Sequence, residues 1–348
     1  TLSELATIKY GKNQKKVVTD DKIIPIYGTG GLMGYATTSL YDKPSVLIGR
    51  KGSIGKVKYV EHPFWTVDTL FYTVINTDIV IPKYLFYSMS LIDLNIYNEG
   101  TTIPSLRTET LNRLEFNIPS IEDQELVLSC INPIDEKIEL NNAINNNLEQ
   151  QAMAIFKSWF IDYEPYNRTV PNNWFEYKLS DFLPVITGKK NTNVSSSIGT
   201  YPFFSCSQDI AWTDEYSFEG NAILVAGNGD FNVKFYNGKF EAYQRTYVLI
   251  PHNPRFSAWL FYAVKYNLNK ITAAARGSVI KFITKGNLED FSFYAPLNLD
   301  DYDVIDQFTA INNIIASNHE EKACLSELRD TLLPKLMSGK IDVSDIDL

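Results

Sequence analysis

The sequence predicts an α+β fold with two tandem, pseudo-symmetric, mostly β domains separated by two long helices that form an antiparallel coiled coil. Three observations predict it: short motifs that recur at a constant separation, strand-like composition within each copy, and two acidic segments with heptad spacing. A chain of 348 residues is too long for one ordinary domain, and 45% hydrophobic residues suffice to bury more than one core.

The chain repeats a series of motifs in the same order. Most recur at a separation of 177 residues, so a chance match is very improbable. The segments "LSELATIKYGKN", "VLIGRKG" and "FNIP" are matched by "LSDFLPVITGKKN", "ILVAGNG" and "FYAP". Aligned residues include Gly11 with Gly188, Gly52 with Gly229, and Gly100 with Gly277. Two copies indicate a pseudo-symmetric molecule and argue against a solenoid.

The first part of each copy is strand-like. Runs of β-branched and aromatic residues broken by Gly, Asn and Pro predict strands at 45–49, 70–74, 222–226 and 246–250. The segments "IPKYLFYSMSL" and "SAWLFYAVKYN" predict short helices. We therefore expect two mostly β domains, at residues 1–120 and 166–297.

Acidic segments at 121–165 and 298–348 follow these domains, and we expect a long helix in each. They contain 2 and 4 basic against 9 and 11 acidic residues, whereas 1–120 and 166–297 each contain 13 basic residues against 11 and 10 acidic ones. The net charge of −9 is thus concentrated in the helical segments, and both β domains are slightly basic. Ser120 and Asp123 predict a helix start, and Asn132-Pro133 predicts a break before a longer helix.

Both acidic segments contain a seam with 4-3 spacing. The seam is mostly apolar, and Asn141 and Asn318 occupy equivalent positions. Such a polar residue fixes the register of paired helices, so we expect the two helices to pack together; two amphipathic helices on separate domains are the alternative. The residues expected at the helix pair are Ile134, Ile138, Asn141, Leu148, Ile155, Trp159, Ile311, Ile315, Asn318, Leu325, Leu332 and Leu336.

The stretch "VLIGRKGSIGKV" at 46–57 contains a glycine-rich basic loop. A Walker loop requires G-x-x-x-x-G-K-[ST] between a strand and a helix, but here valine replaces the hydroxyl residue and strand-like sequence follows. We interpret this loop and its counterpart "AGNGDFNVKF" as turns whose glycines adopt positive φ. Their polar tips differ, as expected of loops that read different bases. A hairpin with merely solvated lysines is the alternative.

Motifs for catalysis are absent from the sequence. "NPID" at 132–135 is in the wrong context for the base-binding motif of an adenine methyltransferase, and no glycine-rich turn for a methyl donor follows a strand. The three cysteines and three histidines are scattered, which indicates reduced thiols and no metal site. No signal peptide opens the chain and no apolar run is long enough for a membrane span. We expect a cytoplasmic, non-catalytic protein.

The ordered series "PIYG", "VLIGRKGSIGKV" and "GTTIPSLRTETLNRLEFNIPSIEDQ", followed by a long acidic helix, resembles the specificity subunit of type I restriction-modification enzymes. The resemblance covers nearly the whole chain and recurs after "VPNNWFEYKLSDF". It implies two target-recognition domains that each read one half of a split duplex DNA target. It also implies association with two methyltransferase subunits and with restriction/translocase subunits. No cofactor is expected in this chain, and S-adenosylmethionine is expected on the methyltransferase partner.

Two departures from the family pattern affect what is carried over. Thr1 aligns with Lys178, so the first copy lacks a counterpart of "VPNNW", and we expect a few residues to precede Thr1. The second tip loop lacks the G-x-x-G-K pattern, so its DNA contacts need not match those of the first. A duplicated protein- or carbohydrate-binding module without DNA specificity is the alternative function.

Candidate DNA contacts are polar or aromatic residues beside glycine-bearing loops, where strand ends place them outside the core. They are Lys12, Tyr27, Arg50, Lys51, Ser53, Lys56, Thr101, Arg107, Lys189, Lys190, Asn228, Asn232, Lys234, Arg245, Arg276 and Ser278. The helices are expected to act as a spacer ruler and as a docking surface for methyltransferase subunits. Their seam, from Ile134 to Trp159, corresponds to about 38 Å of helix, or roughly one turn of duplex DNA.

Overall fold

The computed structural model describes residues 1–343 and contains two compact units. Unit 1 consists of Thr1–Glu139 and the described residues from Lys322 onward, and unit 2 is Leu140–Glu321. Each unit therefore combines a β domain with segments of both long helices. The boundaries at residues 120, 165 and 297 inferred from the sequence describe a different division, between β domains and helices, and stay a prediction.

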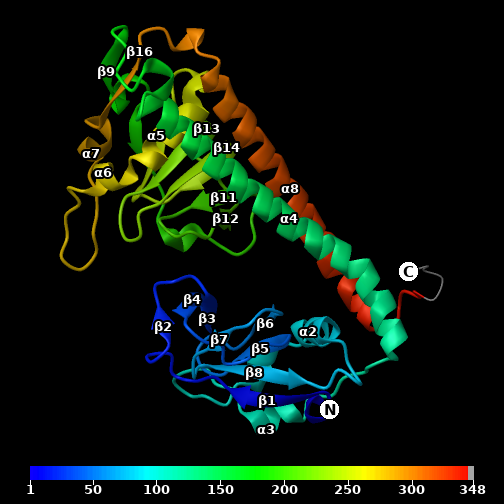
Figure 1. Ribbon diagram of the computed structural model, residues 1–348. Helices are drawn as coiled ribbons and strands as arrows, with labels where there is room; N and C mark the ends of the chain where they lie inside the picture. The colour runs from blue at the N-terminus through cyan, green and yellow to red at the C-terminus, as the bar shows by residue number, and fades with distance from the viewer. Residues whose placement is uncertain (344–348) are drawn as a thin grey trace. The chain divides into compact units, whose positions relative to one another are not determined.

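Unit 1 contains two four-stranded sheets (Figure 1). The first is antiparallel, in the order β1 (Ala6–Tyr10), β8 (Leu70–Ile75), β5 (Ser45–Gly49) and β6 (Val57–Val60). The second has the order β2 (Val18–Thr19), β4 (Gly31–Ala36), β3 (Ile24–Gly28) and β7 (Trp65–Thr66). Helix α2 (Pro82–Ser90) packs against β5 and β6, and α1 (Leu2–Leu5) contacts α3 (Thr108–Asn112). All of β5 is buried, which explains its apolar run 46–48; the hydroxyl of the buried Ser45 donates to Thr73 O at 2.7 Å.

Unit 2 contains a six-stranded sheet and a separate antiparallel pair. The sheet has the order β10 (Val185–Thr187), β15 (Thr246–Leu249), β13 (Phe218–Ala226), β14 (Val233–Ala242), β11 (Tyr201–Phe204) and β12 (Ala211–Thr213). The pair is β9 (Trp174–Lys178) with β16 (Ser292–Pro296). Helix α5 (Ser257–Tyr266) packs against β13 and β14, and α6 (Leu268–Thr272) and α7 (Lys285–Glu289) follow it.

The two units repeat one topology. The order β1-β8-β5-β6 in unit 1 corresponds to β10-β15-β13-β14 in unit 2, and α2 and α3 correspond to α5 and α7. The four strands and two short helices predicted from composition are confirmed. The glycine-rich loop at 46–57 leads from strand β5 into strand β6, and Gly52 and the matching Gly229 have φ of +88° and +74°. The prediction that these loops are turns is therefore confirmed.

Two long helices, α4 (Ile121–Phe160) and α8 (Val304–Met337), run side by side (Figure 1). The start of α4 is confirmed: the backbone N–H of Asp123 donates to the Ser120 hydroxyl at 3.2 Å. The break predicted at Pro133 is wrong, because Pro133 lies inside a continuous helix of 40 residues. Proline removes one helical hydrogen bond there, but the buried Ile131 before it and the bonded Asp135 after it hold the helix to unit 1.

The helices pair in antiparallel orientation through polar and apolar contacts. In unit 2, Asn141 Nδ2 donates to Glu321 Oε2 at 2.7 Å and Asn318 Nδ2 donates to Asn145 Oδ1 at 2.7 Å. The equivalent asparagines Asn141 and Asn318 thus bond different partners. Of the twelve residues expected at the helix pair, Asn141 and Leu336 are buried and the other ten are partly buried. Some of them also belong to a domain core: Ile155, Trp159 and Ile311 pack in unit 2, and Leu332 and Leu336 in unit 1.

A polar cluster attaches α2 to both helix segments of unit 1. The Asp135 carboxylate accepts a hydrogen bond from the Tyr87 hydroxyl and pairs with Arg329 at 3.1 Å. Burial, followed by the bond to Asp135, raises the pKa of Tyr87, so its hydroxyl stays protonated and continues to donate. The acidic residues of the helices are therefore not all solvated, because the Asp135 side chain is only 16% exposed.

We expect Asp135→Ala to lower the free energy of unfolding by about 2–3 kcal/mol, because it leaves a buried hydroxyl and a partly buried guanidinium without their shared acceptor. Urea unfolding followed by circular dichroism measures this change. Glu136→Ala, one residue further along α4 and exposed, is the matched control and should change stability by less than about 0.5 kcal/mol. Equal stability of the two variants would contradict this role of the cluster.

Candidate nucleic-acid interface

Four loops of unit 1 meet at the ends of β1, β5 and β8. The backbone N–H of Gly11 donates to Leu70 O at 2.9 Å, and that of Lys12 donates to Thr66 O at 2.8 Å. Across the same edge, Arg50 N–H donates to Thr69 O at 2.9 Å. The loop before α3 joins them through two further bonds, from Gly52 N–H to Pro104 O at 2.9 Å and from Leu106 N–H to Arg50 O at 3.0 Å. Hydrogen-bonded loops position side chains more precisely than free ones.

Unit 2 builds the same edge with the same five backbone hydrogen bonds. Their donor and acceptor pairs are Gly188 with Thr246, Lys189 with Ala242, Gly227 with Arg245, Gly229 with Lys281, and Ile283 with Gly227, at 2.9–3.1 Å. Equivalent donor residues of the two units are 177 positions apart. Equivalent acceptor residues on or just before β8 and β15 are 176 positions apart. The edge is therefore a duplicated frame, and the side chains on it can be compared position by position.

Arg50 is the most constrained basic side chain of this edge in unit 1. Its Nη1 donates to Asp68 O at 2.9 Å, and its guanidinium carbon lies 5.1 Å from the centroid of the Tyr10 ring. Both contacts fix the guanidinium plane but leave its other N–H groups available. Lys12, Lys51, Ser53, Lys56 and Thr101 are exposed beside it. Arg107 is also exposed and pairs with Glu99 at 3.1 Å.

At the same edge, unit 2 has an open groove of about 700 Å³. Lys189, Arg245 and Lys285 line it, together with Gln244, Thr187 and the aromatic Tyr247 and Phe282. Lys189 and Arg245 are exposed, and Asn228 lies at the groove's rim through its backbone pairing with Phe282. Lys190 pairs with Glu215 at 2.7 Å instead. Three cationic side chains around an open groove suit a polyanion.

A hairpin beyond this groove carries two further predicted contacts. Arg276 and Phe282 exchange both backbone hydrogen bonds, and the chain between α6 and α7 projects as a loop (Figure 1). Arg276 and Ser278 are exposed there, and the adjoining Val279 is 93% exposed. The hairpin therefore presents polar, basic and apolar side chains together.

Three predicted contacts are corrected, because Tyr27 and Asn232 are buried and the half-buried Lys234 is engaged within the protein. Tyr27 is 7% exposed, lies on β3 in a hydrophobic cluster and is bonded through its hydroxyl to His62 Nε2 at 3.3 Å. Asn232 is 9% exposed, and its amide donates to Cys206 O and Asp230 O. Lys234 Nζ donates to Ser207 O and Asn232 Oδ1, both at 2.6 Å, and burial lowers its pKa. These hydrogen bonds engage the side chains within the protein. The position of a residue beside a glycine-bearing loop does not reveal such bonds.

Several residues of the two edges were not among the predicted contacts. Tyr10 and Asp68 hold Arg50 in unit 1, and Thr187, Gln244 and Lys285 line the groove of unit 2. Lys285 could have been predicted from the repeat, since it aligns at the separation of 177 residues with Thr108, beside the predicted Arg107. The role of Asp68 could not have been predicted from its residue type, because its backbone carbonyl makes the contact.

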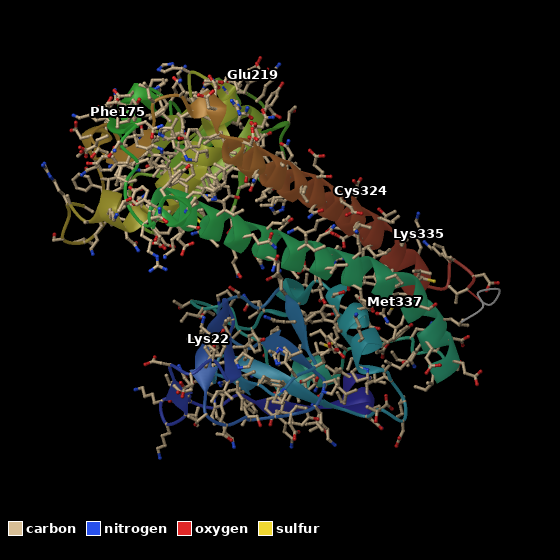
Figure 2. The ribbon with its side chains drawn as sticks, turned by 45° about the horizontal axis from the view of Figure 1, so that its top comes forward. Lys22, Phe175, Glu219, Cys324, Lys335 and Met337 are labelled. Atoms are coloured by element: carbon tan, nitrogen blue, oxygen red, sulfur yellow. The ribbon has the colours of Figure 1, made fainter. Side chains whose placement is uncertain are left out.

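Other kinds of site are not evident in residues 1–343. No helix there is long and apolar enough to cross a membrane, and no group of three or more His, Cys, Asp or Glu side chains is placed to hold a metal ion. Cys130, Cys206 and Cys324 are free thiols, and Cys324 is exposed on α8 (Figure 2).

Comparison with known proteins is consistent with the duplicated frame. The family model "Type I restriction modification DNA specificity domain" matches residues 1–150 and 171–323. The EcoDI specificity subunit of Escherichia coli is 33% identical over 177 residues, which cover 51% of this chain and 35% of that protein. The MjaIX specificity subunit of Methanocaldococcus jannaschii is 22% identical over 353 residues, covering 88% of this chain and 80% of that protein.

A solved structure shares the fold. The crystal structure of the type I restriction-modification S subunit from M. genitalium superposes with a TM-score of 0.60 at 17% identity, covering 97% of this chain and 94% of that one. The family model covers most of both copies, including the residues that build the two edges. The chain therefore belongs to the type I restriction modification DNA specificity family.

Proposed function

We propose that this chain is the DNA sequence-recognition subunit of a type I restriction-modification complex. It catalyses nothing itself, and each unit reads one half of a split duplex target. The observation that supports this most is the duplicated edge: five matching backbone hydrogen bonds hold different side chains in the two units. One frame with two sets of side chains is what two different half-sites require.

Charge supports a division of tasks within the chain. Basic side chains line the edge in both units, whereas the segments 121–165 and 298–348, which contain α4 and α8, have 9 and 11 acidic residues against 2 and 4 basic ones. Acidic helices disfavour DNA and favour protein partners, so we propose that they dock two methyltransferase subunits, with restriction/translocase subunits completing the complex. S-adenosylmethionine is then bound by the methyltransferase. Free thiols and the DNA substrate suit a cytoplasmic site of action.

The test uses the chain assembled with the methyltransferase of its own system, because uncovered acidic helices repel DNA. The affinity of this complex is measured over a range of salt concentrations, for duplexes that contain the sequence it methylates and for duplexes of scrambled sequence. We expect specific binding whose log affinity falls with log salt at a slope near −0.9 per contacted phosphate. Lys12→Ala and Lys189→Ala should each reduce that slope by about 1, since the two lysines occupy equivalent positions.

Equal affinity for target and scrambled duplexes in the complex would contradict DNA sequence recognition. An affinity that does not depend on salt would contradict phosphate contacts, and it is the result expected of a protein- or carbohydrate-binding module.

A further inference from the structure

Both units have an arginine in the same hydrogen-bonded backbone pair. In unit 1 the arginine is the residue that donates its N–H, and in unit 2 it is the residue whose carbonyl accepts. In unit 1, Arg50 N–H donates to Thr69 O, and in unit 2 the equivalent bond joins Gly227 to Arg245. The side chains are thus exchanged: arginine and threonine in one unit, glycine and arginine in the other. Lys12 and Lys189, by contrast, occupy the same position on the same frame.

The exchange has a steric cause in unit 2. A Cβ added to Gly227 would lie 2.4 Å from Arg245 O and 2.9 Å from Tyr247 Cε2, so no side chain fits there. The arginine of unit 2 must therefore come from the other strand of the pair. Residues opposite one another in an antiparallel pair project from the same face, with Cβ atoms about 5 Å apart. Both arginine side chains consequently project from the same face of the edge, but they are attached to neighbouring strands.

The two arginines are presented in a form suited to reading a base. The Arg50 guanidinium is held by Asp68 O at one nitrogen and by the Tyr10 ring at 5.1 Å, so its remaining donors are ordered before any ligand arrives. Arg245 is exposed and lines the groove together with Lys189 and Lys285. A guanidinium fork matches O6 and N7 of guanine in the major groove, whereas a lysine ammonium serves phosphate as a point charge.

We propose that Arg50 and Arg245 are specificity-determining residues, each reading a guanine in a different half-site, from opposite members of the same backbone pair. Lys12 and Lys189, at the shared position, contact phosphate and set the orientation of each unit on the duplex. This inference rests on the proposed function and names the residues by which the two units distinguish their targets.

The experiment maps methylated bases genome-wide in cells that carry the chain and its methyltransferase, without the restriction subunit. With Arg50→Ala, we expect one guanine of one half-site to become dispensable while the other half-site stays unchanged. Arg245→Ala should produce the reciprocal result. With purified complexes, each variant should bind the original target about 5- to 150-fold more weakly, and lysine at either position should not restore the guanine requirement.

Arg113→Ala and Arg168→Ala are the matched controls, because both arginines are exposed and lie outside the four loops of the edge. They should leave both half-sites and the affinity unchanged. Melting temperatures equal to that of the unaltered complex show that Arg50→Ala and Arg245→Ala fold. The inference is overturned if both half-sites persist in these variants, or if binding weakens equally on all sequences with a smaller salt slope. Failure of the proposed function looks different: the unaltered complex would methylate no split target.

Discussion

Phe156→Ala is expected to lower the free energy of unfolding by about 3–5 kcal/mol, because it opens a cavity where both long helices join the core of unit 2. Phe156 is 1% exposed on α4. Its ring stacks on Phe160 at 5.3 Å and lies 5.7 Å from Tyr266 and 6.3 Å from Phe308 of α8. Each such pair adds about 0.5–1.5 kcal/mol beyond the burial of its apolar area. The measurement is urea unfolding of the purified chain.

Leu140→Ala is the matched control on the same helix. Leu140 is 53% exposed, so its truncation removes a large apolar side chain without opening a core cavity. We expect a change below about 0.5 kcal/mol. If both variants unfold at the same urea concentration, the aromatic cluster does not anchor the helices.

Inserting one heptad into both long helices is expected to lengthen the unspecified spacer of the DNA target by roughly three base pairs. Seven residues add about 10 Å of helix, and duplex DNA rises 3.4 Å per base pair. A heptad rotates a straight helix by only about 20° from two full turns. Three base pairs rotate the duplex by roughly 100°, at about 10.5 base pairs per turn, so the DNA or the helix pair must twist for both units to engage the lengthened target. The half-site sequences should not change, since the loops that read them are untouched. This prediction tests the hypothesis, drawn from the sequence, that the helices act as a spacer ruler.

The insertion points follow from the boundaries of the units. One heptad is placed between Glu139 and Leu140, and the other between Glu321 and Lys322. This choice keeps the bond of Asn141 to Glu321 within unit 2 and that of Asp135 to Arg329 within unit 1. Methylated-base sequencing reads the spacer directly. Insertion into α4 alone is the control and should abolish methylation, because the two helices lose their register. A constant spacer with altered half-sites would refute the ruler.

Sequence patterns were sufficient to predict the duplication, the strands at 45–49 and 222–226, the two long helices and the glycine turns. These features depend on local patterns: apolar periodicity, glycine at positive φ, and a capping serine before α4. The sequence also placed Arg50, Arg245 and Lys189 beside glycine-bearing turns, and the structure positions them at the edge that we propose contacts DNA. The failure at Pro133 shows the limit of local rules, since buried neighbours in the core of unit 1 hold the helix through it.

Which loop residues are available for a ligand depends on contacts that the folded chain makes and could not be predicted from the sequence. Tyr27, Asn232 and Lys234 look like surface contacts in the sequence, but hydrogen bonds and packing from distant segments engage them. The tertiary structure also showed that Arg50 is the donor and Arg245 the acceptor residue of equivalent backbone hydrogen bonds. The sequence did not reveal this, because equivalent donors are 177 positions apart and equivalent acceptors of this pair 176. Side-chain availability depends on contacts between segments far apart in the chain, and such contacts leave no local pattern in the sequence.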